Sequence, residues 1–339
     1  MAGTEQMRVA QVTDPETGFE LAERPVPDPG PDEVRIAVDA CGVGPGDDVV
    51  IEGAPPIEYP RVPGHEIAGR VDATGDGVER FAVGDRVAVN RNGGHCFTCD
   101  RCREGEFALC ENGGITGVFS DGGFAEYTLA PSEAVIGVPD GLSAAAAAVH
   151  ACAGSTAHGA LAQSDLAPGD RVAVVGIGGV GHLGVAFAAA SGYETVAVSR
   201  GTSKREAAVD LGADRFVDSE TTDVGEALAE SGGADAVLAT APAPDLIGDA
   251  VSGLAPYGEL LVVASGDQPI PVDPVALFGS RRSVTGWSSG DAAAAERTLQ
   301  FAAREGIEPV VERYDLAETG DAFEAMWNGD VRFRAVVEP

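Results

Sequence analysis

The segment Arg171–Ala190, RVAVVGIGGVGHLGVAFAAA, decides the fold of the second half of this chain. An apolar run leads directly into Gly-x-Gly-x-x-Gly, and an alanine-rich stretch typical of a helix follows. Between a buried strand and a helix this pattern indicates a dinucleotide site. The first glycine permits a tight turn, the second lets the backbone approach a pyrophosphate, and the third allows close helix–strand packing. The residues predicted to hold the cofactor in this turn are Gly176, Gly178, Gly179, Val180 and Gly181.

The regions on either side of this segment differ in character. After Pro168, short apolar runs (RVAVV, TVAVS, AVLAT, ELLVVA and SVTGW) alternate with helical stretches, which predicts βαβ units and a parallel sheet. The first 150 residues are rich in glycine, proline and short β-type runs, which indicates a barrel-like β domain. The strands predicted there are Val34–Val38, Ile67–Val71, Arg86–Val89 and Ala125–Leu129. With 339 residues the chain is expected to form two domains.

Four of the six cysteines lie in one C-x2-C-x2-C-x7-C run, within a lobe predicted over residues 91–115. This spacing allows a short loop to surround one tetrahedral Zn²⁺, and four thiolates leave no open position, so the zinc is expected to be structural. A disulfide-stapled loop or a set of buried thiols is the alternative. MAGTEQMRVA lacks the apolar segment of a secretory signal, which predicts a reducing, cytoplasmic location where clustered cysteines more often bind metal. The predicted ligands are Cys96, Cys99, Cys102 and Cys110.

The net charge of −32 and the pI near 4.3 exclude a general nucleic-acid-binding protein and disfavour docking on anionic lipid. No apolar run is long enough to span a membrane. The acid-rich, lysine-poor composition resembles proteins of salt-loving microbes, in which counterions screen carboxylate repulsion. The sequence therefore predicts a halophilic protein that needs salt to fold, and an ordinary acidic protein is the alternative.

The end of the second strand of the dinucleotide domain bears on the choice of cofactor. An NAD site usually places Asp or Glu there to bind the ribose hydroxyls. Here the strand ends at Ser199 and continues Arg200-Gly-Thr-Ser-Lys204-Arg205, where Lys204 is the only lysine of the chain. A cationic loop without a carboxylate suits a 2′-phosphate, so NADP(H) is predicted over NAD(H), with Ser199, Arg200 and Lys204 as contacts. Chance placement of a lysine at a helix start is the alternative.

The motif Gly64-His65-Glu66-x2-Gly69-x5-Gly75-x2-Val78 resembles the zinc signature of the medium-chain zinc alcohol dehydrogenases. The cysteine lobe and the glycine turn follow in that family's order, and SKREAAVDLGAD is most similar to its NADP-linked, cinnamyl-alcohol-dehydrogenase-like branch. The resemblance implies an α/β fold with a Rossmann doubly wound parallel sheet over 154–288. It also implies a chaperonin-10-like β-barrel catalytic domain over 1–153 and 289–339, a small-molecule alcohol or carbonyl substrate, and a homodimer or homotetramer.

The same resemblance assigns catalytic residues. Family members hold a catalytic zinc through Cys, His and Cys, with a Glu beside the His. Carried onto this chain, the histidine is His65, the glutamate is Glu66, and the second cysteine is Cys152. Asp47 matches the partner of the ligand histidine. The resemblance further places Thr156 near the nicotinamide and Arg334 at the cofactor phosphates.

The first ligand position departs from the family pattern G-[VI]-C-x-[TS]-D. Gly44 stands in place of the ligand cysteine, and Gly46 stands in place of the hydroxyl residue that passes on the substrate proton. Cys41 lies three residues early and is expected to point elsewhere.

Three interpretations follow. In the first, His65, Cys152 and Glu66 bind a second zinc, and the protein is a zinc-assisted alcohol dehydrogenase. In the second, only the structural zinc is kept, and hydride transfer alone reduces a quinone or enone; the segment ACGVGPGDDVV resembles zinc-free quinone oxidoreductases. The third is a cofactor-binding protein without catalysis. Zinc content distinguishes the first from the second, since they predict two and one ions per chain.

Overall fold

The computed structural model describes residues 5–53, 56–266 and 268–339. The first four residues of the opening MAGTEQMRVA, on which the predicted location rests, are outside this set. The chain packs into two compact units: Met1–Cys152 with Ser289–Pro339 (unit 1), and Ala153–Ser288 (unit 2). No helix among the described residues is both long and apolar enough to cross a membrane.

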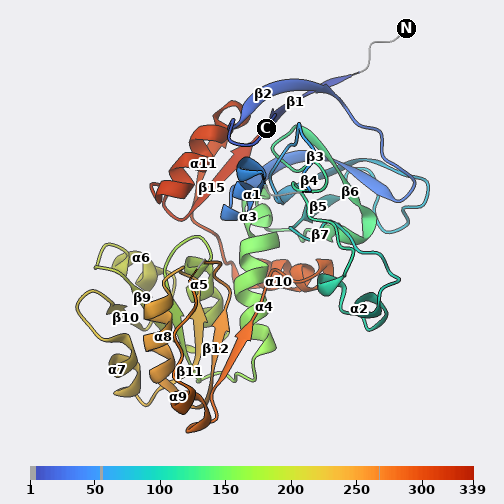
Figure 1. Ribbon diagram of the computed structural model, residues 1–339. Coiled ribbons are helices and arrows are strands. Elements are labelled where there is room, and N and C mark those ends of the chain that lie inside the picture. The colour runs from blue at the N-terminus through green and yellow to red at the C-terminus, as the bar shows by residue number, and fades with distance from the viewer. Residues whose placement is uncertain (1–4, 54–55, 267) are drawn as a thin grey trace. The chain divides into compact units, whose positions relative to one another are not determined.

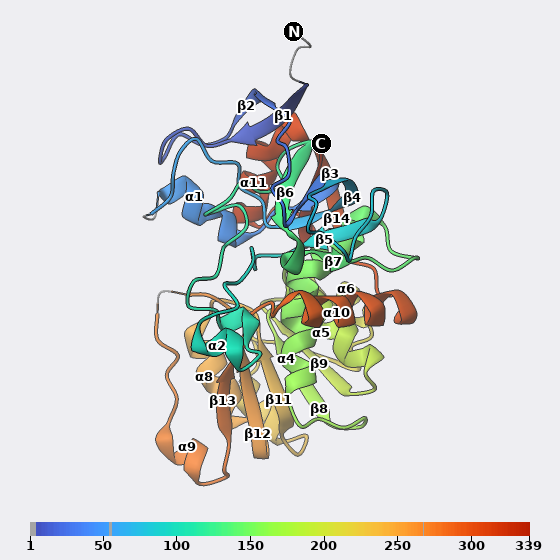
Figure 2. The ribbon, with the colours of Figure 1, turned by 90° about the vertical axis from the view of Figure 1, so that its right-hand side faces the viewer.

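Unit 2 contains a six-stranded sheet in the order β10-β9-β8-β11-β12-β13, and all its pairings are parallel. Figure 2 shows β11, β12 and β13 as neighbouring arrows. The strands are β8 (Arg171–Val175), β9 (Glu194–Ser199), β10 (Arg215–Asp218), β11 (Ala234–Ala239), β12 (Leu254–Val262) and β13 (Ser283–Gly286). The helices are α4 (Ser155–Gln163), α5 (Gly181–Ala190), α6 (Arg205–Asp210), α7 (Val224–Ala229), α8 (Pro244–Ser252) and α9 (Pro274–Phe278).

This strand order confirms the predicted Rossmann sheet. In chain order the strands read 3-2-1-4-5-6, so the direction of winding reverses between β8 and β11. Ligands of such sheets bind at the carboxyl ends of the strands beside this reversal. The central strands contain continuous apolar runs, as expected of a parallel sheet covered on both faces, and Val172–Val175 of β8 is entirely buried.

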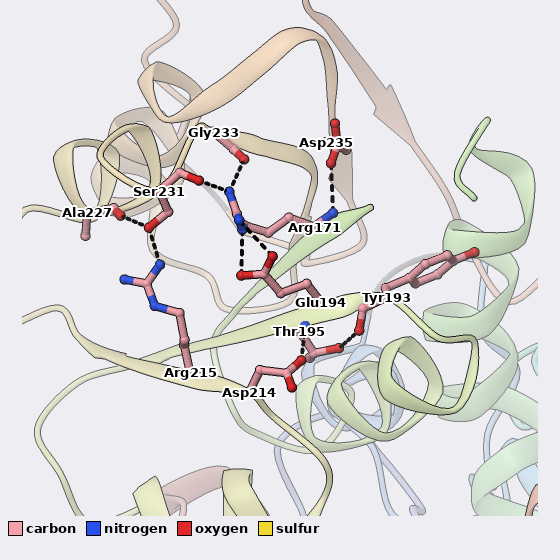
Figure 3. Close-up of polar contacts among 10 residues, drawn as sticks. All are labelled: Arg171, Tyr193, Glu194, Thr195, Asp214, Arg215, Ala227, Ser231, Gly233 and Asp235. Atoms are coloured by element: carbon pink, nitrogen blue, oxygen red, sulfur yellow. Dashed lines mark hydrogen bonds and ion pairs between the residues drawn. The ribbon is translucent and has the colours of Figure 1, made fainter. Parts of the chain in front are cut away.

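The opposite end of β8 is held by a polar network around Arg171, which Figure 3 shows. The Arg171 guanidinium forms two parallel bonds to Glu194 of β9, at 2.9 and 2.7 Å, and also donates to the carbonyl oxygens of Ser231 and Gly233. Its backbone N–H donates to Asp235 of β11 at 2.7 Å. Arg171 therefore links β8 to β9 through its side chain and to β11 through its backbone. The other end of β8 leads into the glycine turn.

Unit 1 is built on a largely antiparallel sheet in the order β14-β15-β3-β4-β5-β7, with β6 paired to β3 (Figure 1). Its strands are β1 (Gln6–Gln11), β2 (Glu20–Pro25), β3 (Glu33–Gly42), β4 (Glu66–Thr74), β5 (Arg86–Val89), β6 (Tyr127–Pro131), β7 (Ile136–Gly137), β14 (Val311–Asp315) and β15 (Arg334–Glu338). The α-helices are α1 (Asp48–Glu52), α2 (Asp100–Arg103), α3 (Ala144–Val149), α10 (Ala292–Glu305) and α11 (Thr319–Asn328). The four strands predicted from the sequence are confirmed as β3, β4, β5 and β6, while the β1–β2 hairpin was not predicted.

Three local features of unit 1 position the metal-binding candidates. Antiparallel pairing of β3 with β4 sets Gly42 opposite Glu66. A 3₁₀ turn, Pro45–Asp47, follows β3 directly. Helix α3 packs against β3 and β4 and continues into a π-helical turn, His150–Gly154, which carries Cys152. Such turns are rare and often occur at functional sites.

Candidate metal and cofactor sites

The four cysteines of the lobe converge on one point. Their sulfur atoms all lie within 4.8 Å of one another, and the Cys96–Cys110 and Cys99–Cys110 sulfur pairs are 3.6 and 3.9 Å apart. A tetrahedron with Zn–S bonds of about 2.3 Å has edges of about 3.8 Å, so the geometry fits zinc. A disulfide would need sulfurs about 2.05 Å apart, and all four cysteines are free. This is a structural Cys₄ zinc site, as predicted.

The backbone of the lobe stabilises thiolates. The N–H of Cys99 donates to the sulfur of Cys96 at 3.4 Å, and the N–H of Cys96 donates to that of Cys110 at 3.3 Å. Hydrogen bonds from Thr98, followed by those from Asn112 and Cys99, lower the pKa of Cys96 to about 5. Burial raises the pKa of Cys102 to about 12, so this thiol needs the metal charge to ionise.

A second cluster brings together His65, Glu66 and Cys152, as the family resemblance implied. One ligand atom of each lies within 4.8 Å of the others, and the three residues are buried. A nitrogen, an oxygen and a sulfur donor at this separation suit Zn²⁺. The residues present therefore fit a catalytic metal. His65 ends a loop, Glu66 begins β4, and Cys152 lies in the π-helical turn.

Asp47 orients the histidine of this cluster. Its carboxylate lies 2.8 Å from Nδ1 of His65 and also accepts the N–H groups of Gly44 and Gly64, at 3.0 and 3.2 Å. Because an ionised carboxylate only accepts, the proton of the neutral imidazole is on Nδ1 and Nε2 is free to bind a metal. Burial lowers the pKa of His65, but the charge and hydrogen bond of Asp47, followed by those of Cys152, outweigh it and raise that pKa well above its usual range. Without a metal the imidazole therefore tends to hold a second proton on Nε2, which a metal ion has to displace.

Gly44 occupies the backbone position from which the family cysteine would reach the cluster. A Cβ atom built on Gly44 would lie 3.5 Å from Cε1 and 3.7 Å from Nε2 of His65. Cys41 does not replace the missing thiol. Its side chain is fully buried in the apolar core of unit 1, and its sulfur lies near Gly64 and Gly123.

Glu66 pairs with Arg334, the first residue of β15. The ion pair joins Oε2 of Glu66 to Nη2 of Arg334, and the two side chains are only 3 and 4 % exposed. The sequence did not reveal this contact, since 268 positions separate the two residues. In unit 1 Arg334 thus forms a buried ion pair with Glu66. Its contact with the cofactor phosphates stays a prediction.

In unit 2 the glycine turn has the geometry that a dinucleotide needs. Gly176 has φ +96°, which favours glycine, and a Cβ atom on Gly181 would lie 1.7 Å from the carbonyl oxygen of Gly176. A Cβ atom on Gly178, in contrast, would meet nothing within 4 Å. The turn therefore needs its first and third glycines for its own packing, while the second faces open space at the N-terminus of α5.

The loop after β9 presents cations that carboxylates do not neutralise. Ser199 is buried, Arg200 is exposed, and within the described residues neither Arg200 nor Lys204 has a carboxylate at ion-pair distance. Burial, followed by the charge of Arg200, lowers the pKa of Lys204. Thr156 lies in α4 and is partly exposed.

Comparison with known proteins identifies relatives over almost the whole length of the chain. Residues 30–140 match the family described as "Alcohol dehydrogenase GroES-like domain", and residues 179–304 match "Zinc-binding dehydrogenase". The chain is 38% identical over 320 residues to the alcohol dehydrogenase patD of Penicillium expansum, covering 94% of each. It is 40% identical over 317 residues to the alcohol dehydrogenase notN of an Aspergillus strain, covering 94% of this chain and 93% of that protein. A cinnamyl alcohol dehydrogenase structure from Sorghum bicolor superposes with a TM-score of 0.88 at 29% identity, over 98% of each chain.

Proposed function

The chain belongs to the medium-chain zinc-dependent alcohol dehydrogenase family, and from this membership we propose that it transfers a hydride between NADP(H) and an alcohol, aldehyde or ketone. It is a zinc-containing, NAD(P)-dependent alcohol dehydrogenase with a GroES-like domain and a Rossmann domain. The observation that carries the proposal is the buried cluster of His65, Glu66 and Cys152, supported by Asp47. This cluster lies in unit 1, and the glycine turn for the cofactor lies in unit 2.

In the proposed site His65, Cys152 and Glu66 hold a catalytic zinc. A zinc ion there would supply Lewis-acid polarisation of the substrate oxygen. Asp47 holds a proton on Nδ1 of His65 and so directs Nε2 toward the metal position, and Arg334 fixes the orientation of Glu66 through Oε2. Since Gly46 offers no hydroxyl group, the substrate proton leaves through water.

The preference for NADP(H) rests on the loop after β9. Arg200 and Lys204 lie in the short segment between β9 and α6 and have no carboxylate at ion-pair distance among the described residues, which suits a 2′-phosphate. In a chain of net charge −32 such a site also needs local positive charge to admit a cofactor phosphate.

A homodimer or homotetramer is part of the proposal. Strand β13 forms one edge of the parallel sheet and its residues are exposed. Large apolar side chains are exposed on and beside this edge: Val284 by 44%, Val275 by 60%, Phe278 by 73% and Tyr257 by 70%. Apolar exposure of this size supports association of two copies there. Light scattering of a Phe278→Asp variant, expected to yield a smaller species than the wild type, tests this part.

The halophilic character and the cytoplasmic location complete the proposal. Carboxylates greatly outnumber cations, 54 to 22, and six free cysteines suit a reducing compartment. Circular dichroism between 0.1 and 3 M KCl tests the halophilic character, since the helical signal should grow with salt. A helical signal that is already complete at 0.1 M KCl would contradict the proposed salt requirement.

Metal analysis of the purified protein tests the central proposal. Two zinc ions per chain are expected, together with chelator-sensitive oxidation of primary alcohols with NADP⁺. The missing cysteine at Gly44 favours one competing function, a quinone or enone reductase with only the lobe zinc. One zinc per chain, with enone reduction insensitive to chelator, would establish that alternative. Cofactor binding without turnover of any carbonyl compound would indicate a non-catalytic protein.

A further inference from the structure

A cavity of unit 1 lies between the cysteine lobe, which carries α2, and the N-terminal end of α10 (Figure 1). Its volume is about 240 Å³, and its wall is mainly apolar. The segment between β6 and β7 completes the wall. His65, Glu66 and Cys152 are not part of it, so the proposed dehydrogenase reaction does not account for this cavity.

Aromatic side chains of the lobe form one side of the cavity. His95 stacks on Phe107 with the ring centroids 4.3 Å apart, and Phe97 makes an edge contact with His95 at 4.4 Å. Phe97 is 57% exposed and Phe107 is half-buried, so part of this aromatic surface is accessible to a ligand. The faces of phenylalanine rings attract cations, and quaternary ammonium ions are typical ligands of aromatic sites.

The unpaired charge beside these rings is negative. Oε1 of Glu133 lies 3.1 Å from a Cβ atom built on Gly94, the residue before His95, which places this carboxylate next to the aromatic side chains. Among the residues that the structure describes, no cation lies at ion-pair distance from Glu133. The guanidinium that lines the cavity, that of Arg80, pairs with Glu296 at 2.5 Å and therefore does not neutralise Glu133.

The N-terminus of α10 does not make the cavity an anion site. Asp291 is the N-cap of α10 and accepts the N–H of Ala294 at 2.8 Å. Its carboxylate thus already occupies the place that an anion would take at a helix start. A bound anion would in addition be repelled by both Asp291 and Glu133, which line the cavity. A cation with an apolar surface suits both the rings and the carboxylates.

We propose that this cavity binds a small organic cation of the quaternary ammonium class. Its methyl groups contact the rings of Phe97 and Phe107, and Glu133 and Asp291 balance its charge. An inorganic cation fits less well, because contact with the apolar wall would remove its water without replacing it. The site lies outside the proposed metal cluster and does not depend on the dehydrogenase function.

A matched pair of ligands tests the inference. Tetramethylammonium and tert-butyl methyl ether are similar in size, and only the first carries a charge. Neither is an alcohol or a carbonyl compound. Saturation-transfer NMR titrations on the full-length, zinc-loaded protein in 1 M KCl at pH 8 measure both affinities. The attraction between a cation and aromatic faces predicts a dissociation constant for tetramethylammonium about tenfold lower than that for the ether.

Two substitutions with matched controls locate the site. Glu133→Gln removes the unpaired charge and should weaken tetramethylammonium binding about three- to tenfold. Glu111→Gln removes a charge of the same lobe outside the cavity wall and should bind like the wild type. Phe97→Leu keeps an apolar side chain without the ring and should also bind about three- to tenfold more weakly. Phe119→Leu is its control, since Phe119 is 47% exposed and outside the wall.

The controls make the inference refutable in a chain of net charge −32. Equal affinity for tetramethylammonium and the ether would show an apolar cavity without selectivity for cations, and would overturn it. Equal losses in Glu133→Gln and Glu111→Gln would show only diffuse attraction of cations to an acidic protein, with the same consequence. Absence of saturation transfer to tetramethylammonium would also overturn it. The titrations need no turnover, so a failure of the proposed dehydrogenase function would leave their result unaffected.

Discussion

Arg334→Met should destabilise unit 1 far more than the loss of an ordinary ion pair. Arg334 and Glu66 are 4 and 3 % exposed, so removing the guanidinium leaves a buried carboxylate without its partner. Such a loss costs about 3–5 kcal/mol. A surface pair in the same sheet provides the comparison, because Arg313 and Glu338 are 55 and 44 % exposed and 2.8 Å apart. Arg313→Met should cost no more than about 1 kcal/mol.

Urea unfolding of the zinc-saturated protein in 1 M KCl measures both values. The chain has two tryptophans, of which Trp327 lies in unit 1 and Trp287 in unit 2. A Trp287→Phe background therefore leaves Trp327, stacked on Phe323 at a ring distance of 5.8 Å, as the indole reporter of unit 1. At this ionic strength the Debye length is about 3 Å, which screens the exposed pair much more than the buried one.

A second background isolates the charge. In Glu66→Gln the neutral amide needs no counter-charge, so Arg334→Met should cost much less there than in the wild type. If Arg334→Met and Arg313→Met cost the same, or if the cost of Arg334→Met is unchanged by Glu66→Gln, the reasoning from burial is refuted.

Three further predictions concern the metals and the cofactor. Cys102→Ser should lose about one zinc per chain by elemental analysis and lower the melting temperature, whereas Cys41→Ala should keep the metal content of the wild type, because Cys41 is a core residue. Asp47→Asn should weaken the second metal site about ten- to a hundredfold in a chelator competition without loss of the lobe zinc; an unchanged affinity would show that Asp47 does not orient His65. Lys204→Ala should raise the KM for NADP⁺ about tenfold and leave that for NAD⁺ nearly unchanged, since only a 2′-phosphate uses the lysine charge; parallel changes for both cofactors would exclude that contact.

The parts of the structure that the sequence revealed are those encoded locally. Gly176 is required by its own φ of +96° and Gly181 by its close approach to the carbonyl oxygen of Gly176, and the cysteine lobe closes a short loop on itself. The spacing of glycines and cysteines along the sequence is therefore sufficient to predict the glycine turn and the cysteine lobe. The strand rhythm of unit 2 was equally readable because its central strands are buried on both faces and therefore contain continuous apolar runs, such as Val172–Val175.

The parts that the sequence did not reveal depend on long-range packing. The pairing of Glu66 with Arg334 arises because β4 and β15, which are far apart in the sequence, both pair with β3. The Arg171 network depends on the register of β8, β9 and β11. The missing cysteine at Gly44 was visible in the sequence. Only the coordinates show that a Cβ atom at this position would contact both His65 and Glu66.

The π-helical turn His150–Gly154 makes the site sensitive to chain length as well as to residue type. A π turn holds about one residue more than an α-helical turn, and each residue of an α-helix rotates the next by about 100°. Deleting Ala151 would leave every proposed ligand in the chain but would turn the sulfur of Cys152 away from His65. In comparisons among relatives, a one-residue gap at this point should accordingly signal a lost metal site as reliably as a substituted cysteine.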